Sequence, residues 1–113
     1  MIKSQYLYNA LVTAVYDGDT VTVDIDLGLH VWVKAEKLRL HRINAPEVRG
    51  VEREQGLIAR DWLRQRILNQ PLVIETIQDT KGKYGRYLVE LWLGEVNIND
   101  VLVSEGLAEY KAY

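Results

Sequence analysis

The chain has 113 residues, which leaves room for one domain with a single core, so we expect one domain over residues 1–113. It contains no cysteine, which excludes a disulfide partner and a thiolate metal site. The formal charge of −2 argues against a strongly basic nucleic-acid binder, but residues 34 to 66 hold nine basic side chains against five acidic ones, a local excess of four.

The N-terminal third of the sequence reads as β structure. Apolar and polar residues alternate from Tyr6 to Val33, which predicts two strands joined at Asp17-Gly18. Asp-Gly between alternating runs favours a tight hairpin turn, because glycine adopts positive φ at little cost. No continuous apolar run occurs here, so we expect no signal peptide, no membrane contact and a cytoplasmic location.

The middle of the chain adds a third strand and a helix. Leu27-Gly28-Leu29 predicts a turn, and residues 30–43 predict the third strand, which ends at Asn44-Ala45-Pro46 because proline cannot donate to a ladder. Residues 51–68 contain no proline and predict one long amphipathic helix. Its expected apolar side consists of Val51, Ile58, Ala59, Trp62 and Leu63.

The last third predicts two more strands and a short helix. The strands are expected over 72–77 and 87–93, and the helix over about 98–105, with Asn97 or Asn99 as its N-cap and Gly106 as its stop signal. Three strands, a helix and two strands match a mainly β fold with helices, the five-stranded OB barrel. We expect a monomer.

Four polar clusters interrupt this barrel pattern at strand ends and turns. They are Asp17-Gly18-Asp19-Thr20, Arg39, Asn44-Ala45-Pro46-Glu47 and Lys83-Tyr84-Gly85-Arg86. Each cluster alone is compatible with turn chemistry or simple solvent exposure. Asp17 fits turn chemistry, whereas Asp19 opens a strand and could instead be an oxygen ligand of the kind that Ca²⁺ or another hard divalent cation prefers.

Taken together, the clusters supply the groups that phosphodiester hydrolysis requires. Arg39 lies mid-strand between Leu38 and Leu40, so its face must be polar or paired. Two planar guanidiniums, those of Arg39 and Arg86, would form the usual clamp for a phosphoryl group. Glu47 would deprotonate or orient water, and Asp19 would hold a divalent metal.

At these residues the chain resembles the staphylococcal nuclease (thermonuclease) family. The resemblance rests on four motifs in order: VYDGDTVTV at 15–23, LRLHRINAPE at 38–47, KYGRYL at 83–88 and NINDVLVSEGLA at 97–108. It implies calcium-dependent cleavage of DNA, or of both DNA and RNA, as an endonuclease or exonuclease. By resemblance, Asp19 is a calcium ligand, Arg39 and Arg86 bind phosphate, and Glu47 is the general base.

The resemblance also implies secondary site residues and one departure. Lys83 and Tyr84 match residues beside the nucleotide phosphate, and Tyr110 and Tyr113 match a stacking tyrosine less closely. Asn44 stands where the family has a second calcium-ligand aspartate, and Ala45 follows where a backbone carbonyl also faces the metal; the lost charge should weaken the metal site. The alternative hypothesis is a catalytically idle OB-like module that binds nucleic acid or protein.

Overall fold

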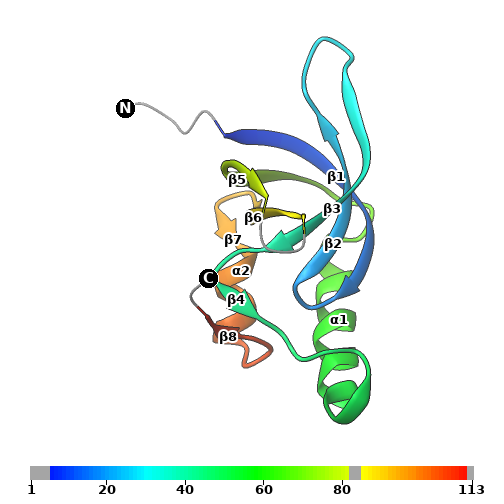
Figure 1. Ribbon diagram of the computed structural model, residues 1–113, viewed down its shortest axis with the longest axis vertical. Coiled ribbons are helices and arrows are strands. Elements are labelled where there is room, and N and C mark those ends of the chain that lie inside the picture. Colours follow the sequence, from blue (N-terminus) through cyan, green and yellow to red (C-terminus); the bar gives the residue numbers. More distant parts are fainter. Residues whose placement is uncertain (1–5, 82–84, 112–113) are drawn as a thin grey trace.

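Long β-strands form the body of the molecule (Figure 1). The computed structural model describes residues 6–81 and 85–111, without the side chains of 78–80. The long strands are β1 (Leu7–Asp17), β2 (Thr20–Asp26), β3 (Trp32–Leu40), β5 (Pro71–Lys81) and β6 (Tyr87–Leu93). Short strands that the sequence pattern did not predict are β4 (Ile43–Asn44), β7 (Val96–Asn97) and β8 (Glu109–Tyr110).

The long strands close into a barrel. Antiparallel pairing gives the order β3-β2-β1-β5-β6, and a parallel pairing of β3 with β6 joins the two ends. That pairing sets Leu38 against Tyr87 and Leu40 against Val89. This closed barrel with two helices confirms the predicted OB fold, and the alternation of the strands explains it: Val21 and Val23 point into the core while Thr22 does not.

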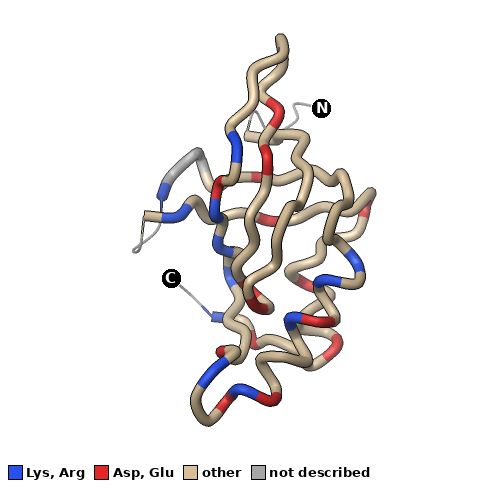
Figure 2. Tube along the Cα trace, turned by 90° about the vertical axis from the view of Figure 1, so that its right-hand side faces the viewer, with Lys and Arg blue, Asp and Glu red and all other residues tan. Residues whose placement is uncertain are grey.

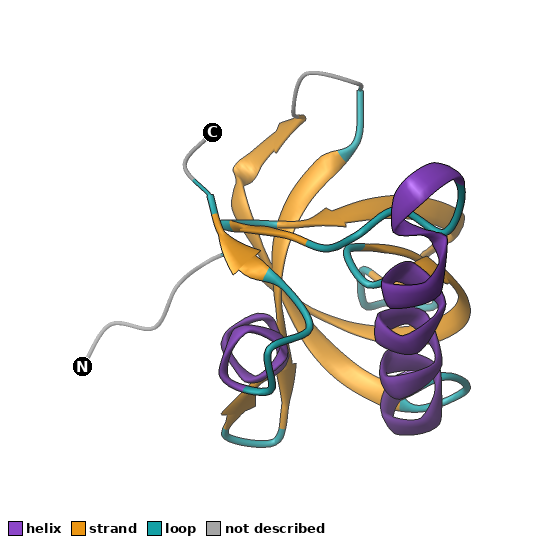
Figure 3. Ribbon diagram, turned by 90° about the horizontal axis from the view of Figure 1, so that it is seen from below, coloured by secondary structure: helices purple, strands orange, loops and turns teal. Residues whose placement is uncertain are grey.

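The helix α1 (Arg53–Ile67) follows a 3₁₀ turn, η1 (Gly50–Glu52), and lies along one side of the barrel, with α2 (Ile98–Ser104) on another side (Figure 3). Its buried face consists of Gly56, Ala59, Leu63 and Ile67. The predicted apolar face was wrong for Val51 and Ile58, which are exposed; Val51 falls in the 3₁₀ turn before the helix begins. In the described part of the chain, no helix is long and apolar enough to cross a membrane.

The short helix α2 (Ile98–Ser104) is anchored by Asn99. Asn97 is the N-cap, since its side chain accepts a hydrogen bond from the Asp100 N–H. Asn99 is instead fully buried: its Oδ1 accepts from the Leu91 N–H at 3.1 Å, and its Nδ2 donates to the carbonyls of His41 and Val89. One amide side chain therefore ties α2 to β6 and to the end of β3.

Two glycines allow close approaches that position the loop between β4 and α1. Gly18 is not at positive φ, contrary to the reason we gave for the hairpin; a Cβ there would lie 2.7 Å from the Ala45 Cβ and 3.0 Å from the Ala59 Cβ. A Cβ on Gly56 would lie 2.0 Å from the carbonyl oxygen of Glu47. The β1–β2 turn and α1 therefore contact this loop with no room for a side chain.

Gly56→Ala is therefore expected to destabilise the protein by about 1–3 kcal/mol, the usual range for overpacking. The direction of the stability change is diagnostic, because alanine in place of glycine inside a helix normally stabilises the helix by about 1 kcal/mol. Here the new methyl group would meet backbone atoms, which cannot move aside as a flexible side chain can. Urea unfolding measures the change, with exposed Gln55→Ala on the same helix as the control; equal stability of Gly56→Ala and wild type would refute the packing argument.

Candidate active site

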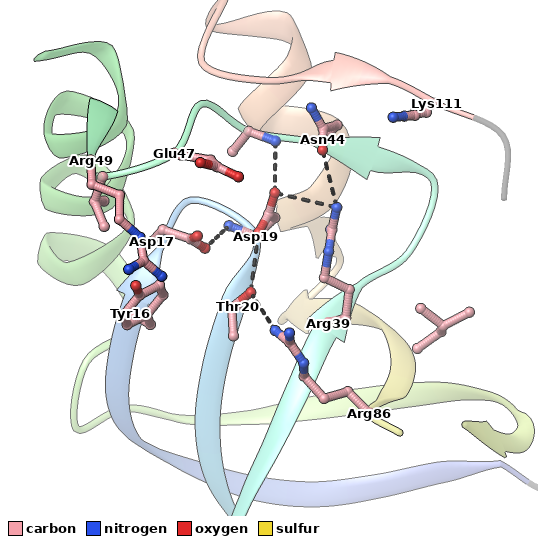
Figure 4. A pocket seen from close by; sticks show the side chains of 13 residues that line it. Tyr16, Asp17, Asp19, Thr20, Arg39, Asn44, Glu47, Arg49, Arg86 and Lys111 are labelled. Carbon is pink, nitrogen blue, oxygen red and sulfur yellow. Dashed lines mark hydrogen bonds and ion pairs between the residues drawn. The ribbon is translucent and has the colours of Figure 1, made fainter. Parts of the chain in front are cut away.

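A cleft of about 570 Å³ lies where the β1–β2 turn, the ends of β3 and β4 and the start of β6 meet. Figure 4 shows its side chains converging from these separate segments. Four described segments supply the predicted residues Asp19, Arg39, Asn44, Ala45, Glu47 and Arg86, all of which line it. Residues that the motifs place far apart in the chain are thus brought together.

Asp19 is the most connected carboxylate of the cleft. Its Oδ2 accepts from the Ala45 N–H at 2.8 Å and lies 3.4 Å from Arg39 Nη2, and its Oδ1 accepts from the Thr20 hydroxyl at 3.1 Å. The side chain is buried, with 6% of the residue exposed. Asp19 therefore joins the start of β2 to β3 and to the β4 loop, and each of its oxygens can accept more than one bond.

Asp17 lies beside it as a second buried carboxylate. Its Oδ1 accepts from the Asp19 N–H at 3.0 Å, so the expected turn chemistry is present. Yet Asp17 is only 9% exposed and lines the cleft. Burial, followed by the side-chain hydrogen bond between the Asp17 and Asp19 carboxyl groups and the repulsion of the Asp19 charge, raises the pKa of Asp17 to about 7, although the bond from the Asp19 N–H lowers it. A cation between the two carboxylates would relieve this repulsion.

Arg39 and Arg86 lie together on one side of the carboxylates. Arg39 Nη1 donates to the carbonyls of Leu40 at 2.9 Å and Ile43 at 3.1 Å, so its face is paired, as its mid-strand position required. Arg86 Nη1 donates to the Thr20 hydroxyl at 3.3 Å. Arg39 thus pairs with Asp19 directly, and Arg86 binds the Thr20 hydroxyl that donates to the same aspartate, which pre-organises two positive groups at the wall of one cleft (Figure 4).

Asn44 and Glu47 come from the segment that follows β3. Asn44 Oδ1 accepts from Arg39 Nη2 at 3.3 Å, and the Ala45 N–H binds Asp19, so both predicted metal-site residues adjoin the carboxylate. Glu47 is exposed and extends from its loop towards the Asp17 and Asp19 side chains (Figure 4). The Glu47 N–H donates to Glu52 Oε1 at 3.5 Å, which helps to hold the loop against the start of α1.

Other predicted substrate residues are not brought to the cleft by the described structure. Lys83, Tyr84 and Tyr113 lie outside the described residues. Tyr110 is exposed and does not line the cleft; its hydroxyl donates to Asp100 Oδ1 at 2.9 Å, a bond that raises the pKa of Tyr110. Its contact with substrate stays a prediction.

The sequence analysis assigned no role to several residues that line the cleft. Thr20 links Asp19 to Arg86, and Lys111 reaches the cleft from the end of the described chain, where its N–H donates to the Arg42 carbonyl. Tyr16 and Arg49 also line it. The Asp17-Gly18-Asp19 spacing was a usable signal for a carboxylate pair, whereas nothing in the pattern around Lys111 indicates its position.

The oxygen donors of the cleft fit a hard divalent cation such as Ca²⁺. The Asp17 and Asp19 carboxylates lie side by side with the Asn44 amide oxygen near, which is the donor chemistry that calcium prefers. Two carboxylates are few ligands for tight binding of calcium, however. Across residues 6–81 and 85–111, no group of three His, Cys, Asp or Glu side chains is arranged to hold a metal. The donor set therefore fits a weakly bound cation.

A closed OB barrel whose cleft gathers Asp19, Arg39, Glu47 and Arg86 is the arrangement that the resemblance to the staphylococcal nucleases implied. The family model described as staphylococcal nuclease homologue matches residues 37–113, and the chain belongs to this family, which confirms the resemblance. It is 34% identical over 105 residues to the thermonuclease of Staphylococcus hyicus, which covers 90% of this chain and 59% of that protein. The thermonuclease of Staphylococcus intermedius is also 34% identical, over 91% of this chain and 60% of its own length. The chain thus spans about three fifths of these relatives.

The raised pKa of Asp17 predicts how stability depends on pH in the metal-free protein. Between its ordinary value of 3.8 and about 7, Asp17 is protonated when folded and ionised when unfolded, so unfolding releases a proton. The contribution of Asp17 to the free energy of unfolding therefore falls as pH rises through this window, by up to about 1.4 kcal/mol per pH unit. Above the window this contribution is constant.

Asp17→Asn keeps an acceptor for the Asp19 N–H and cannot ionise, so this variant should gain stability over wild type as pH rises from about 4 to about 7. Urea unfolding in chelator measures the difference between the two curves. Asp61→Asn, at an exposed position on α1, is the control and should track wild type. Parallel curves for wild type and Asp17→Asn would show that burial does not hold the proton on Asp17.

Proposed function

We propose that the protein is a metal-dependent nuclease that hydrolyses phosphodiester bonds of DNA, or of both DNA and RNA. The observation that carries the proposal is the meeting of a carboxylate pair, two arginines and Glu47 in one cleft from segments far apart in the chain. Family membership and the two thermonuclease relatives support the same activity. A bound divalent cation would supply Lewis-acid stabilisation of the phosphate charge.

In this proposal the basic and acidic residues of the cleft have different roles in hydrolysis. Arg39 and Arg86 bind the non-bridging phosphate oxygens, whose negative charge grows as water adds to phosphorus. Glu47 accepts a proton from that water as the new phosphorus–oxygen bond forms, and the ester oxygen leaves with a proton from solvent. Asp19, with Asp17 and Asn44, would provide oxygen ligands for a divalent cation. The exposure of Glu47 suits this role, because the attacking water must enter from solvent.

Arg86→Ala is the decisive variant for catalysis. Removing one preorganised donor typically costs about 10²–10³ in rate, and the loss should fall mainly on kcat because the phosphorane carries more charge than the bound diester. Glu47→Gln should cost on the order of 10²–10⁴. Arg39→Ala should lose activity and also stability, since Arg39 holds the Leu40 and Ile43 carbonyls.

The measurement is cleavage of single-stranded DNA and of RNA across a calcium titration, with circular dichroism to check the fold. Arg53→Gln, at an exposed position of α1, removes one positive charge outside the cleft and should cleave as wild type does. Equal cleavage by Arg86→Ala and wild type would refute the site. If wild type cleaves neither DNA nor RNA with any divalent metal, the protein is the non-catalytic binding module that the loss of a carboxylate at Asn44 favours.

Asn44→Asp should bind calcium more tightly than wild type, on the order of tenfold, because it restores a formal charge to the donor set. Calorimetry or terbium luminescence measures this without reference to activity. Asn69→Asp adds the same charge at an exposed position outside the cleft and should leave affinity unchanged. Tight binding that survives Asp19→Ala would move the metal elsewhere.

A further inference from the structure

The hairpin of β2 and β3 projects beyond the barrel as a stiff arm (Figure 1). Its tip is closed by short hydrogen bonds, from the Leu27 N–H to the Val31 carbonyl at 2.8 Å and from the Gly28 N–H to Asp26 Oδ1 at 2.8 Å. Apolar side chains are nevertheless exposed on it, with Leu29 96% and Trp32 44% accessible. The tip of the hairpin, residues 27–31, contributes no side chain to the buried core or to the cleft.

One face of β3 connects the arm to the cleft. Leu38 and Leu40 point into the core. The residues that alternate with them, Lys37 and Arg39, therefore point outward. Ala35, at φ 55° and with its N–H bound to Asp24 Oδ1, forms a bulge that resets the alternation. Beyond that bulge Lys34 also faces outward, because its Nζ lies 3.5 Å from Asp24 Oδ2 and 5.0 Å from the Trp32 ring centroid.

The outward face thus carries Trp32, Lys34, Lys37 and Arg39 in a row that ends in the cleft. Seven residue steps at about 3.3 Å each give a row of about 23 Å. Acidic residues of the hairpin lie mainly on β2, as Asp24 and Asp26, and only Glu36 belongs to β3 (Figure 2). On the same outward face Asp24 pairs with Lys34 and Asp26 lies opposite Trp32, so the positive charge of the row is strongest towards its cleft end, at Lys37 and Arg39. A polyanion would be held at that end of β3 and repelled from β2.

We propose that this row is a docking track for single-stranded nucleic acid, which leads the strand from the cleft to a base-stacking platform on Trp32. The lysines would contact successive phosphates, and the exposed indole would stack on an unpaired base. The track rests on the proposed function for its substrate. The track has one further consequence: the protein should cleave long single strands more efficiently than short diesters, because only long strands make contacts remote from the cleaved bond.

The test compares a dinucleotide with an oligothymidylate of about 16 nucleotides, the upper range that one OB barrel covers. Trp32→Ala should lower kcat/KM for the long substrate by about 5- to 100-fold, as expected for one lost stacking contact, and leave the dinucleotide unchanged. Trp32→Phe should restore the preference for length. Lys37→Gln should reduce the salt dependence of long-strand affinity by about 0.7 in the log–log slope, whereas Arg53→Gln should not.

Leu29→Ser is the matched control on the arm, because Leu29 is more exposed than Trp32 but has no ring to stack on a base. If Leu29→Ser impairs the long substrate as much as Trp32→Ala does, the tip is a general apolar surface for a protein or a bilayer and the track is wrong. An unchanged ratio of long to short cleavage in Trp32→Ala overturns it equally.

Binding without cleavage separates the track from the proposed activity. In chelator, oligothymidylate should quench the tryptophan fluorescence of the wild type, and Trp32→Phe should abolish that quenching while Trp62 and Trp92 remain. Quenching by a wild type that cleaves nothing would refute the nuclease and support the track. Cleavage of both substrates with quenching that survives Trp32→Phe would support the nuclease and refute the track.

Discussion

The hydrogen bonds of Asp19 are the constraint on which the cleft depends. Two oxygens of one buried carboxylate hold the Ala45 N–H, the Thr20 hydroxyl and the Arg39 guanidinium, so a turn, a strand and a loop are fixed to a single group. A buried charge is tolerated only where such partners compensate for lost hydration. The oxygens that order the cleft are therefore also the ones that a cation would bind, which joins the architecture of the site to its proposed chemistry.

Much of this arrangement was predictable because it is encoded locally. Alternation gives the strands, Asn97 caps α2 and Gly106 ends it, and the structure confirms each of these. The cleft was predictable for a different reason: polar residues at strand ends had no place in an apolar core, and a closed barrel brings strand ends together. Asp19, Arg39 and Glu47 are neighbours for that reason.

What the sequence could not predict depends on contacts between distant segments. A buried amide and a capping amide look alike in sequence, so only packing distinguishes Asn99 from Asn97. Gly56 reads as a weak point of a helix, yet its missing side chain makes room for the Glu47 backbone. Asp17 reads as a turn residue, and its proton affinity follows from burial beside a second carboxylate that no local pattern reports.

The parallel pairing of β3 with β6 also affects the order in which parts of the protein can fold. It joins Leu38 to Tyr87, 49 residues further along the chain, and contacts so distant form slowly because a long loop must first close. Arg39 lies within this pairing, opposite Leu88, and Arg86 directly precedes it, so the two arginines become neighbours only when the barrel closes. A partly folded chain with an open barrel therefore lacks the wall on which the two arginines meet, and the positive charge of the cleft is assembled only when the barrel closes.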